Sequence, residues 1–285
     1  MEPTNFRGFG LQELKTDNRD FQLGNIIKLP KLSELPNEFI IEPITIKHQG
    51  NTDQCTAYTS TLMSEVQENI ELNPAFSFAA SKSLSGDPEV WGQNLRDAFQ
   101  AHVKFGALPQ REALTLIGKY NSEELRYFDK WRFVMDKAEP YAKKSFFFVT
   151  GPYDDFDNIK ASLWYFRNEK RLIGIGVIWS WALTQEILEI PEENGFGHAV
   201  TVIGWEKRDG KDYLVIQNSY GKEAGENGRH YLSRKAVNTF VKRFGAGMFL
   251  DLPKNTAKYY NESRIKLSDN WVVVLIKKFF SFIKI

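Results

Sequence analysis

The sequence predicts an α+β fold in which a helical half precedes a strand-rich half. Apolar residues recur at helical spacing across residues 54–71, which indicates a long helix. The segments His198–Gly204 and Tyr213–Gln217 are rich in branched apolar residues, and the turn residues between them are typical of a β-hairpin. A cleft between the two halves is the place where we expect a functional site.

Two more helices are predicted in the first half. One spans Gln93–Phe105 and ends at Gly106, and the other runs from Ser122 into the region of Trp131. Cys55 stands in the first turn of the helix at 54–71, where backbone N–H groups stabilise a thiolate.

The second half begins with the apolar run Phe146–Val149. A helix is predicted at Ile159–Arg167 and a strand at Leu172–Ile178, ahead of the hairpin. We divide the chain into an N-terminal arm, a domain and a C-terminal extension, at residues 1–34, 35–252 and 253–285. The arm is expected to lie on the domain surface. The helical half takes about residues 50–145 and the β-rich half about residues 146–252.

Composition excludes several classes of function. The 37 basic and 36 acidic residues leave a net charge of +1, so the overall charge of the chain does not favour binding to a nucleic acid or an anionic membrane. We find neither a glycine-rich phosphate loop nor a cluster of metal ligands, and we expect no cofactor, no metal and no nucleic-acid partner. The 42% hydrophobic content suffices for a large folded core.

The chain has a single cysteine, which excludes an intrachain disulfide. The start of the sequence, Met1–Arg7, lacks the basic residues and apolar run of a signal peptide. We therefore expect a cytoplasmic, reducing location.

Four residues carry the catalytic hypothesis. A lone cysteine is usually structural, but His198 and Asn218 follow Cys55 in the order and at the separations of a nucleophile, a base and an orienting group. A thiol is weakly ionised at neutral pH, so it needs an imidazole that holds its proton. Asn218 would orient the ring, and Gln49 with the Cys55 N–H would stabilise an oxyanion. For His48, His102 and His230 a plain structural role is the simpler interpretation.

Beyond these residues the sequence resembles the papain-like cysteine peptidases, in particular their bacterial and archaeal branch, in which Thr or Ser follows the nucleophile as Thr56 does here. The resemblance covers roughly residues 16–250. Four segments match family motifs: Thr16–Phe21 with D-x-R-D, Leu35–Pro36 with the start of the mature domain, Gly92–Phe99 with G-x-x-x-R-D-A-L, and Asn218–Gly228 with N-S-W-G and G-E-x-G.

The resemblance implies a papain-like fold, with a helical half, an antiparallel β-barrel-like half and the active-site cleft between them. It implies Cys55, His198, Asn218 and Gln49 as catalytic residues. Trp91, Gly92 and Tyr220 are the candidates for substrate binding. A turn glycine is an equally good interpretation of Gly92.

The sequence departs from the family pattern at two places. Thr52, Asp53 and Gln54 stand where the family often has Gly-Ser or a cysteine. Asp53 and Gln54 place a carboxylate and a bulky amide at the mouth of the site, where we expect them either to raise the pKa of the thiol or to narrow access to the primed side. Tyr220 replaces the tryptophan that shields the bond between histidine and asparagine, so a smaller aromatic shield is expected.

The favoured function is that of a cysteine endopeptidase acting on a protein or peptide through an acyl-enzyme. The same chemistry also suits an isopeptide bond, a peptidoglycan crosslink or acyl transfer to an amine. A silent binding protein on this fold is the alternative from another class, and it is weakened because all four catalytic residue types are present.

The C-terminal segment Trp271–Ile285 is predominantly apolar, and its lysines and serine fall on one side of a helix. It is too short to span a bilayer, so we expect either peripheral contact with a membrane or partner, or packing against the domain.

Overall fold

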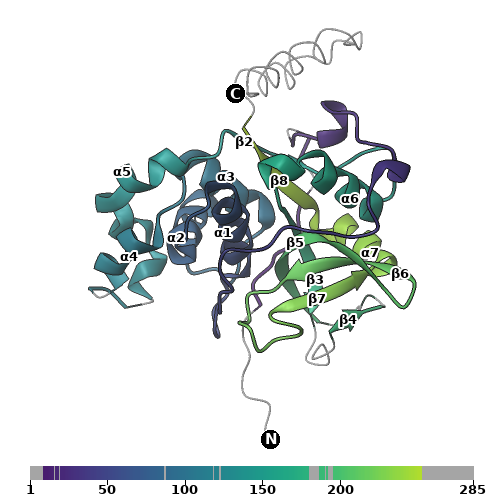
Figure 1. The fold of residues 1–285 in the computed structure, drawn as a ribbon. Helices are drawn as coiled ribbons and strands as arrows, with labels where there is room; N and C mark the ends of the chain where they lie inside the picture. The colour runs from purple at the N-terminus through teal and green to yellow at the C-terminus, as the bar shows by residue number, and fades with distance from the viewer. Residues whose placement is uncertain are drawn as a thin grey trace, which may run out of the picture.

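The computed structural model describes residues 9–15, 17, 18, 20–86, 88–117, 119–121, 123–179, 186–189, 191 and 195–251. In this part of the chain, helices α1–α5 gather on one side, and the sheet with helices α6 and α7 lies on the other (Figure 1). The predicted α+β class with two unlike halves is confirmed. The C-terminal segment at 271–285 lies outside the described residues.

The helical half contains α1 (Cys55–Glu68), α2 (Pro74–Ser85), α3 (Leu95–Phe105), α4 (Gln110–Ile117) and α5 (Met135–Ala138). Two of these helices begin at an asparagine cap: Asn73 accepts a hydrogen bond from the N–H of Phe76, and Asn94 accepts one from the N–H of Asp97. The helices predicted at 54–71 and 93–105 are confirmed, because α1 and α3 occupy most of those ranges.

The α-helix predicted from Ser122 is wrong. Two 3₁₀ helices stand there, η3 (Glu124–Arg126) and η4 (Phe128–Val134). The indole Nε1 of Trp131 donates to the carbonyl of Leu125 at 2.9 Å. An α-helix would use that carbonyl four residues on, so the buried tryptophan competes with the α-helical bond. Other 3₁₀ turns are η1 (Leu23–Asn25), η2 (Leu32–Glu34), η5 (Glu139–Tyr141) and η6 (Arg167–Glu169).

The β-rich half is a single mostly antiparallel sheet. Its strands are β1 (Phe39–Ile40), β2 (Ser145–Phe148), β3 (Ile173–Trp179), β4 (Ile187–Leu188), β5 (Phe196–Arg208), β6 (Lys211–Gln217), β7 (Arg229–Ser233) and β8 (Ala246–Leu250). The order is β2-β8-β3-β5-β6-β7-β4, with β1 paired to β5. The predicted hairpin is β5 and β6. The barrel-like expectation needs correction, because this path does not close and β4 pairs with β7 in parallel.

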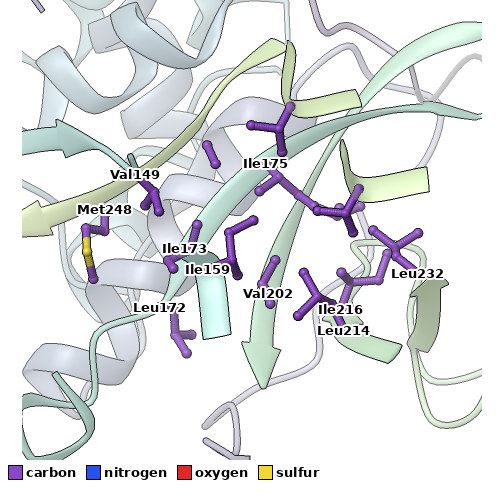
Figure 2. Packing of buried hydrophobic residues seen from close by; sticks show 14 of the residues in the cluster. Val149, Ile159, Leu172, Ile173, Ile175, Val202, Leu214, Ile216, Leu232 and Met248 are labelled. Carbon is purple, nitrogen blue, oxygen red and sulfur yellow. The ribbon is translucent and has the colours of Figure 1, made fainter. Parts of the chain in front are cut away.

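One large core joins the two halves. Side chains of β3, β5, β6, β7 and β8 pack with Ile159 of α6 (Asp155–Tyr165) and with α7 (Arg234–Phe244), as Figure 2 shows in part. The same cluster includes Leu62, Met63 and Val66 of α1. A separate small cluster under α2 and α4 contains Phe76 and Trp131. Helix α1 is therefore anchored in the core of the sheet.

Close packing of α1 on the sheet depends on Gly174 of β3. A Cβ at this position would lie 2.9 Å from the Thr59 methyl group and 3.0 Å from the sulfur of Met63. The missing side chain lets the helix approach the strand. Cys55, at the start of α1, then contacts Ala199 of β5. Among the described residues, no helix has the length and apolar composition needed to cross a membrane.

Candidate active site

The structure brings His198 and Asn218 together from neighbouring strands. His198 lies in β5, and Asn218 directly follows β6. The imidazole Nε2 is 2.8 Å from the amide Oδ1 of Asn218, which also accepts the backbone N–H of Ser219 at 2.8 Å. Because that oxygen can only accept, we assign the ring proton to Nε2, and Nδ1 becomes the basic nitrogen.

Aromatic rings enclose this buried pair. Tyr220 stacks on His198 with ring centroids 4.8 Å apart and an interplanar angle of 13°, and its hydroxyl lies 3.4 Å from Nδ1. Trp179 meets the imidazole edge-on at 5.5 Å, and Phe9 does so at 5.9 Å. Rings in this arrangement limit the access of water, which strengthens the bond between His198 and Asn218.

Cys55 is the first residue of α1, and its side chain is fully buried. Burial raises the pKa of the thiol to about 11, and the charge of Asp53 acts in the same direction. Hydrogen bonds from the backbone N–H groups of Ala199, Gly10 and Thr56 oppose this rise. Ala199 follows His198 in β5, so the thiol lies against the strand that carries the imidazole. Burial therefore favours the protonated form of the thiol in this conformation.

Gln49 is held beside the same site because its chain segment pairs with the segment at Ser219. Its backbone N–H donates to the carbonyl of Ser219 at 2.8 Å, and its side-chain oxygen accepts the Ser219 hydroxyl. The side-chain nitrogen donates to the carbonyl of Thr52 at 2.9 Å. These contacts fix the amide between the turn that leads to Cys55 and the segment that follows Asn218.

Residues 9–12, here called the N-terminal strap, lie next to the thiol, between Gln93 and Gly197 of β5. Besides the contact of Gly10 with Cys55, the Leu11 N–H donates to the carbonyl of Gly197 at 3.0 Å. The Gly10 carbonyl accepts the Gln93 N–H at 2.6 Å, and the Gln12 N–H donates to the Gln93 carbonyl at 3.0 Å. Strap residues 9–11 are buried, which differs from the arm expected on the domain surface.

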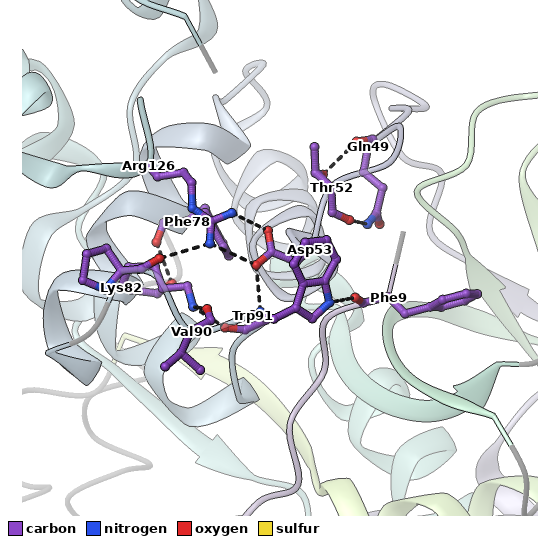
Figure 3. Close-up of polar contacts among 12 residues, drawn as sticks. Phe9, Gln49, Thr52, Asp53, Phe78, Lys82, Val90, Trp91 and Arg126 are labelled. Atoms are coloured by element: carbon purple, nitrogen blue, oxygen red, sulfur yellow. Dashed lines mark hydrogen bonds and ion pairs between the residues drawn. The ribbon is translucent and has the colours of Figure 1, made fainter. Parts of the chain in front are cut away.

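Trp91 and Gly92, two of the residues predicted to bind substrate, contact this strap. The Trp91 indole donates to the carbonyl of Phe9 at 2.6 Å (Figure 3). Gly92 has φ +75°, and a Cβ there would lie 2.0 Å from the carbonyl oxygen of Gly10. Both the turn and the close approach of another chain segment therefore require glycine. Residues 91–93, here called the 91–93 edge, lie along one side of the strap.

Sequence reasoning missed the polar contacts behind this edge. Asp53 accepts the N–H of Gly92 and both terminal nitrogens of Arg126, while the ammonium of Lys82 reaches the carbonyls of Val90 and Gly92 (Figure 3). Lys82 stands among mostly small or apolar residues in α2, and a buried lysine needs hydrogen-bond partners. The sequence therefore held a signal for the contacts of Lys82. Nothing in the sequence pointed to Arg126.

Comparison with known proteins identifies the family to which this chain belongs. Residues 42–243 match the model of the family described as papain family cysteine protease. Cathepsin S of Mus musculus is 22% identical over 205 residues, which are 68% of this chain and 56% of that protein. The viral cathepsin of Lymantria dispar multicapsid nuclear polyhedrosis virus is 24% identical over 68% of this chain and 52% of its own length. The chain thus spans little more than half the length of these relatives.

A solved structure shows the same fold. Xylellain, a cysteine protease from Xylella fastidiosa, superposes with a TM-score of 0.67 at 18% identity, covering 88% of this chain and 99% of xylellain. The family match extends from the segment before Gln49 to the end of α7, and it includes Cys55, His198 and Asn218.

Proposed function

Because this chain belongs to the papain family of cysteine proteases, we propose that it hydrolyses peptide bonds through an acyl-enzyme on Cys55. The sulfur attacks the carbonyl carbon while its proton passes to Nδ1 of His198. The resulting tetrahedral oxyanion accepts hydrogen bonds from the Cys55 N–H and the Gln49 amide. His198 returns the proton to the leaving amine. Water then attacks the thioester while His198 takes its proton, and that proton passes to the sulfur as the acid product leaves.

One observation carries this proposal. The 2.8 Å contact between His198 Nε2 and Asn218 Oδ1 orients the imidazole, and the thiol hydrogen-bonds the backbone of the next residue in β5. An oriented imidazole close to a cysteine in the first turn of a helix is an arrangement that can activate a thiol.

The substrate that we propose for this site is an extended peptide. The backbone N–H and C=O of Gln93 and the carbonyl of Gly197 hold the N-terminal strap by hydrogen bonds in the manner of a strand. We propose that a substrate peptide uses the same backbone groups, with Trp91 and Tyr220 as flanking surfaces.

Thiol labelling and hydrolysis test the proposal together. At neutral pH we expect a peptidyl epoxysuccinate to label wild type at Cys55, and Cys55→Ala to lose both labelling and cleavage of a peptide library. His198→Ala should remove nearly all cleavage, whereas Asn218→Ala should keep a fraction because it loses only orientation. Cleavage at the wild-type rate by Cys55→Ala would refute the assignment.

We also propose a reducing, cytoplasmic location, which the single cysteine supports. Peripheral contact of residues 271–285 with a membrane or partner is a separate proposal from the sequence. Co-sedimentation of full-length protein with anionic vesicles, compared with a chain that ends before Asn270, tests that contact. Equal sedimentation of the two chains would argue against it.

A further inference from the structure

Asp53 is a buried carboxylate with partners on two other segments. Its side chain is 1% exposed. Oδ2 accepts the backbone N–H of Gly92 at 2.7 Å, and Arg126 donates to Oδ1 at 3.0 Å and to Oδ2 at 3.3 Å (Figure 3). A buried charge is tolerated only when it is paired and hydrogen-bonded, so these partners explain how an acidic residue is accommodated two positions before Cys55.

The bond to Gly92 determines which way the 91–93 edge faces. The Gly92 N–H points inward to Asp53, whereas the next residue, Gln93, turns its N–H and its C=O to the strap. The position of a peptide bound to this edge therefore depends on the hydrogen bond between Asp53 and Gly92. Because Asp53 belongs to the turn that leads into α1, the same residue also sets the distance from the edge to the thiol.

The other contacts hold the loop without joining it to the nucleophile. The buried ammonium of Lys82 donates to the carbonyls of Val90 and Gly92 from α2. Arg126 also donates to the carbonyl of Pro88 at 3.0 Å. Among these groups, Asp53 alone stands on the chain segment that carries Cys55. With one cysteine in the sequence, no intrachain disulfide can make this connection.

We propose that Asp53, with Arg126 as its counter-ion, is a positioning residue that holds the 91–93 edge in register with the Cys55 sulfur for peptide substrates. The inference rests on the proposed peptidase function and adds the link between peptide binding and the nucleophile. Loss of the contact between Asp53 and Gly92 should slow reactions that require a bound peptide, and it should have little effect on the rate at which the thiol alone reacts.

Two thiol reagents separate these effects in the full-length protein. Iodoacetamide alkylates Cys55 without using the edge, whereas a peptidyl epoxysuccinate must first seat its peptide there. We expect Asp53→Ala to lower the ratio of the epoxysuccinate rate to the iodoacetamide rate by about tenfold or more, the scale of one lost hydrogen bond to a charged group. Asp53→Asn keeps an acceptor for Gly92 and should show a smaller fall.

Asp212→Asn is the matched control, because it removes the carboxylate of the ion pair with Lys160 in the β-rich half. The ratio should stay unchanged in this variant. If Asp53→Ala does not fold, the double variant Asp53→Ala, Arg126→Gln removes both charges together with the acceptor for Gly92 and is measured in its place. Hydrolysis should show the same split, with KM raised more than kcat is lowered.

The outcomes separate the two proposals. If wild type is not labelled by the epoxysuccinate and cleaves no peptide, the proposed function fails and this inference fails with it. If wild type is labelled and the ratio stays the same in the Asp53 variants, only the positioning role is refuted. A fall in the ratio that is confined to the Asp53 and Arg126 variants supports it.

Discussion

At the scale of single residues, the site combines an imidazole oriented by a hydrogen bond with a thiol whose pKa is raised. The Asn218 oxygen fixes His198, but burial and the nearby Asp53 raise the pKa of Cys55. A nucleophile with a raised pKa has little thiolate at neutral pH. We therefore expect the pKa of the thiol to fall when the strap leaves this site, because burial is the main cause of its rise.

The first prediction concerns Gln49. Its side chain is locked by Ser219 and Thr52, so Gln49→Ala removes one proposed oxyanion donor and leaves the nucleophile and base in place. We expect turnover to fall by about 10² to 10³-fold. Steady-state kinetics on a fluorogenic peptide measure this fall, and iodoacetamide alkylation of Cys55 should stay near the wild-type rate. An unchanged kcat would exclude Gln49 from the oxyanion site.

The second prediction concerns His102 of α3, which is fully buried with Nδ1 2.9 Å from the Ser64 hydroxyl. Burial lowers the pKa of His102 to about 3, and the charge of Lys143 contributes. The unfolded chain, with a histidine pKa of about 6.5, binds a proton that the folded chain does not, so this stability is present above that pH and lost below it. From pH 6.5 to 5 we expect a loss of about 2 kcal/mol.

Urea unfolding at the two pH values measures this loss. His102→Phe keeps a ring in the cavity and removes the titrating group. Its unfolding free energy should lack this part of the pH dependence, although it starts lower because Ser64 loses its partner. The same pH dependence in wild type and variant would contradict the assignment.

At the scale of elements, the N-terminal strap connects α1, the 91–93 edge and β5. It pairs with Gln93 and Gly197 through the backbone, and its Phe9 ring stacks on Phe196 at 5.3 Å. The strap thus occupies the backbone groups that we assign to a substrate peptide. Substrate and strap are expected to exclude each other.

The third prediction uses Gly10 to displace the strap. A Cβ at Gly10 would lie 2.2 Å from the backbone oxygen of Asp53, so Gly10→Ala cannot keep this position. Burial is the main reason for the raised pKa of Cys55, and its relief should lower the pKa from about 11 toward 9. At pH 8 the thiolate fraction, and with it the iodoacetamide rate, should rise by up to ~100-fold. An unchanged rate at an unchanged melting temperature would show that the strap does not limit access.

At the scale of the whole molecule, the two halves are joined by packing and polar contacts. Helix α1 lies in the core cluster of the sheet, and the buried Lys143 pairs with Glu68 at the end of α1. Arg96 of α3 pairs with Asp20, whose motif was part of the sequence resemblance, and so fastens the N-terminal segment to the helical half. The single cysteine contributes chemistry and no crosslink.

The fourth prediction follows from that absence of a crosslink. Dithiothreitol should leave the melting temperature nearly unchanged, because the chain has no intrachain disulfide to lose. Mild peroxide should silence hydrolysis by oxidising Cys55 to a sulfenic acid, and dithiothreitol should restore it. Differential scanning fluorimetry and activity assays on the same samples measure both. A large drop in melting temperature on reduction would instead require a bridge between two chains.

The sequence by itself determined the α+β class, α1 with Cys55 at its start, the β5–β6 hairpin, and the candidates Gln49, His198 and Asn218. These features are local, because apolar periodicity and turn residues act over a few positions, and the motifs are short. The 3₁₀ geometry at 124–134 was not predictable from periodicity, since it depends on where the Trp131 indole finds its acceptor.

Only the tertiary structure decided the contacts of Asp53 and the place of the strap. Asp53 and Arg126 stand 73 positions apart, and neither has a local pattern that predicts the other. The strap is held mainly through backbone N–H and C=O groups, which every residue type except proline provides, so its side chains carry little signal of where it binds. Burial of Cys55 and the contacts of the strap with Gln93 and Gly197 arise only when both halves are folded, and this burial raises the pKa of Cys55.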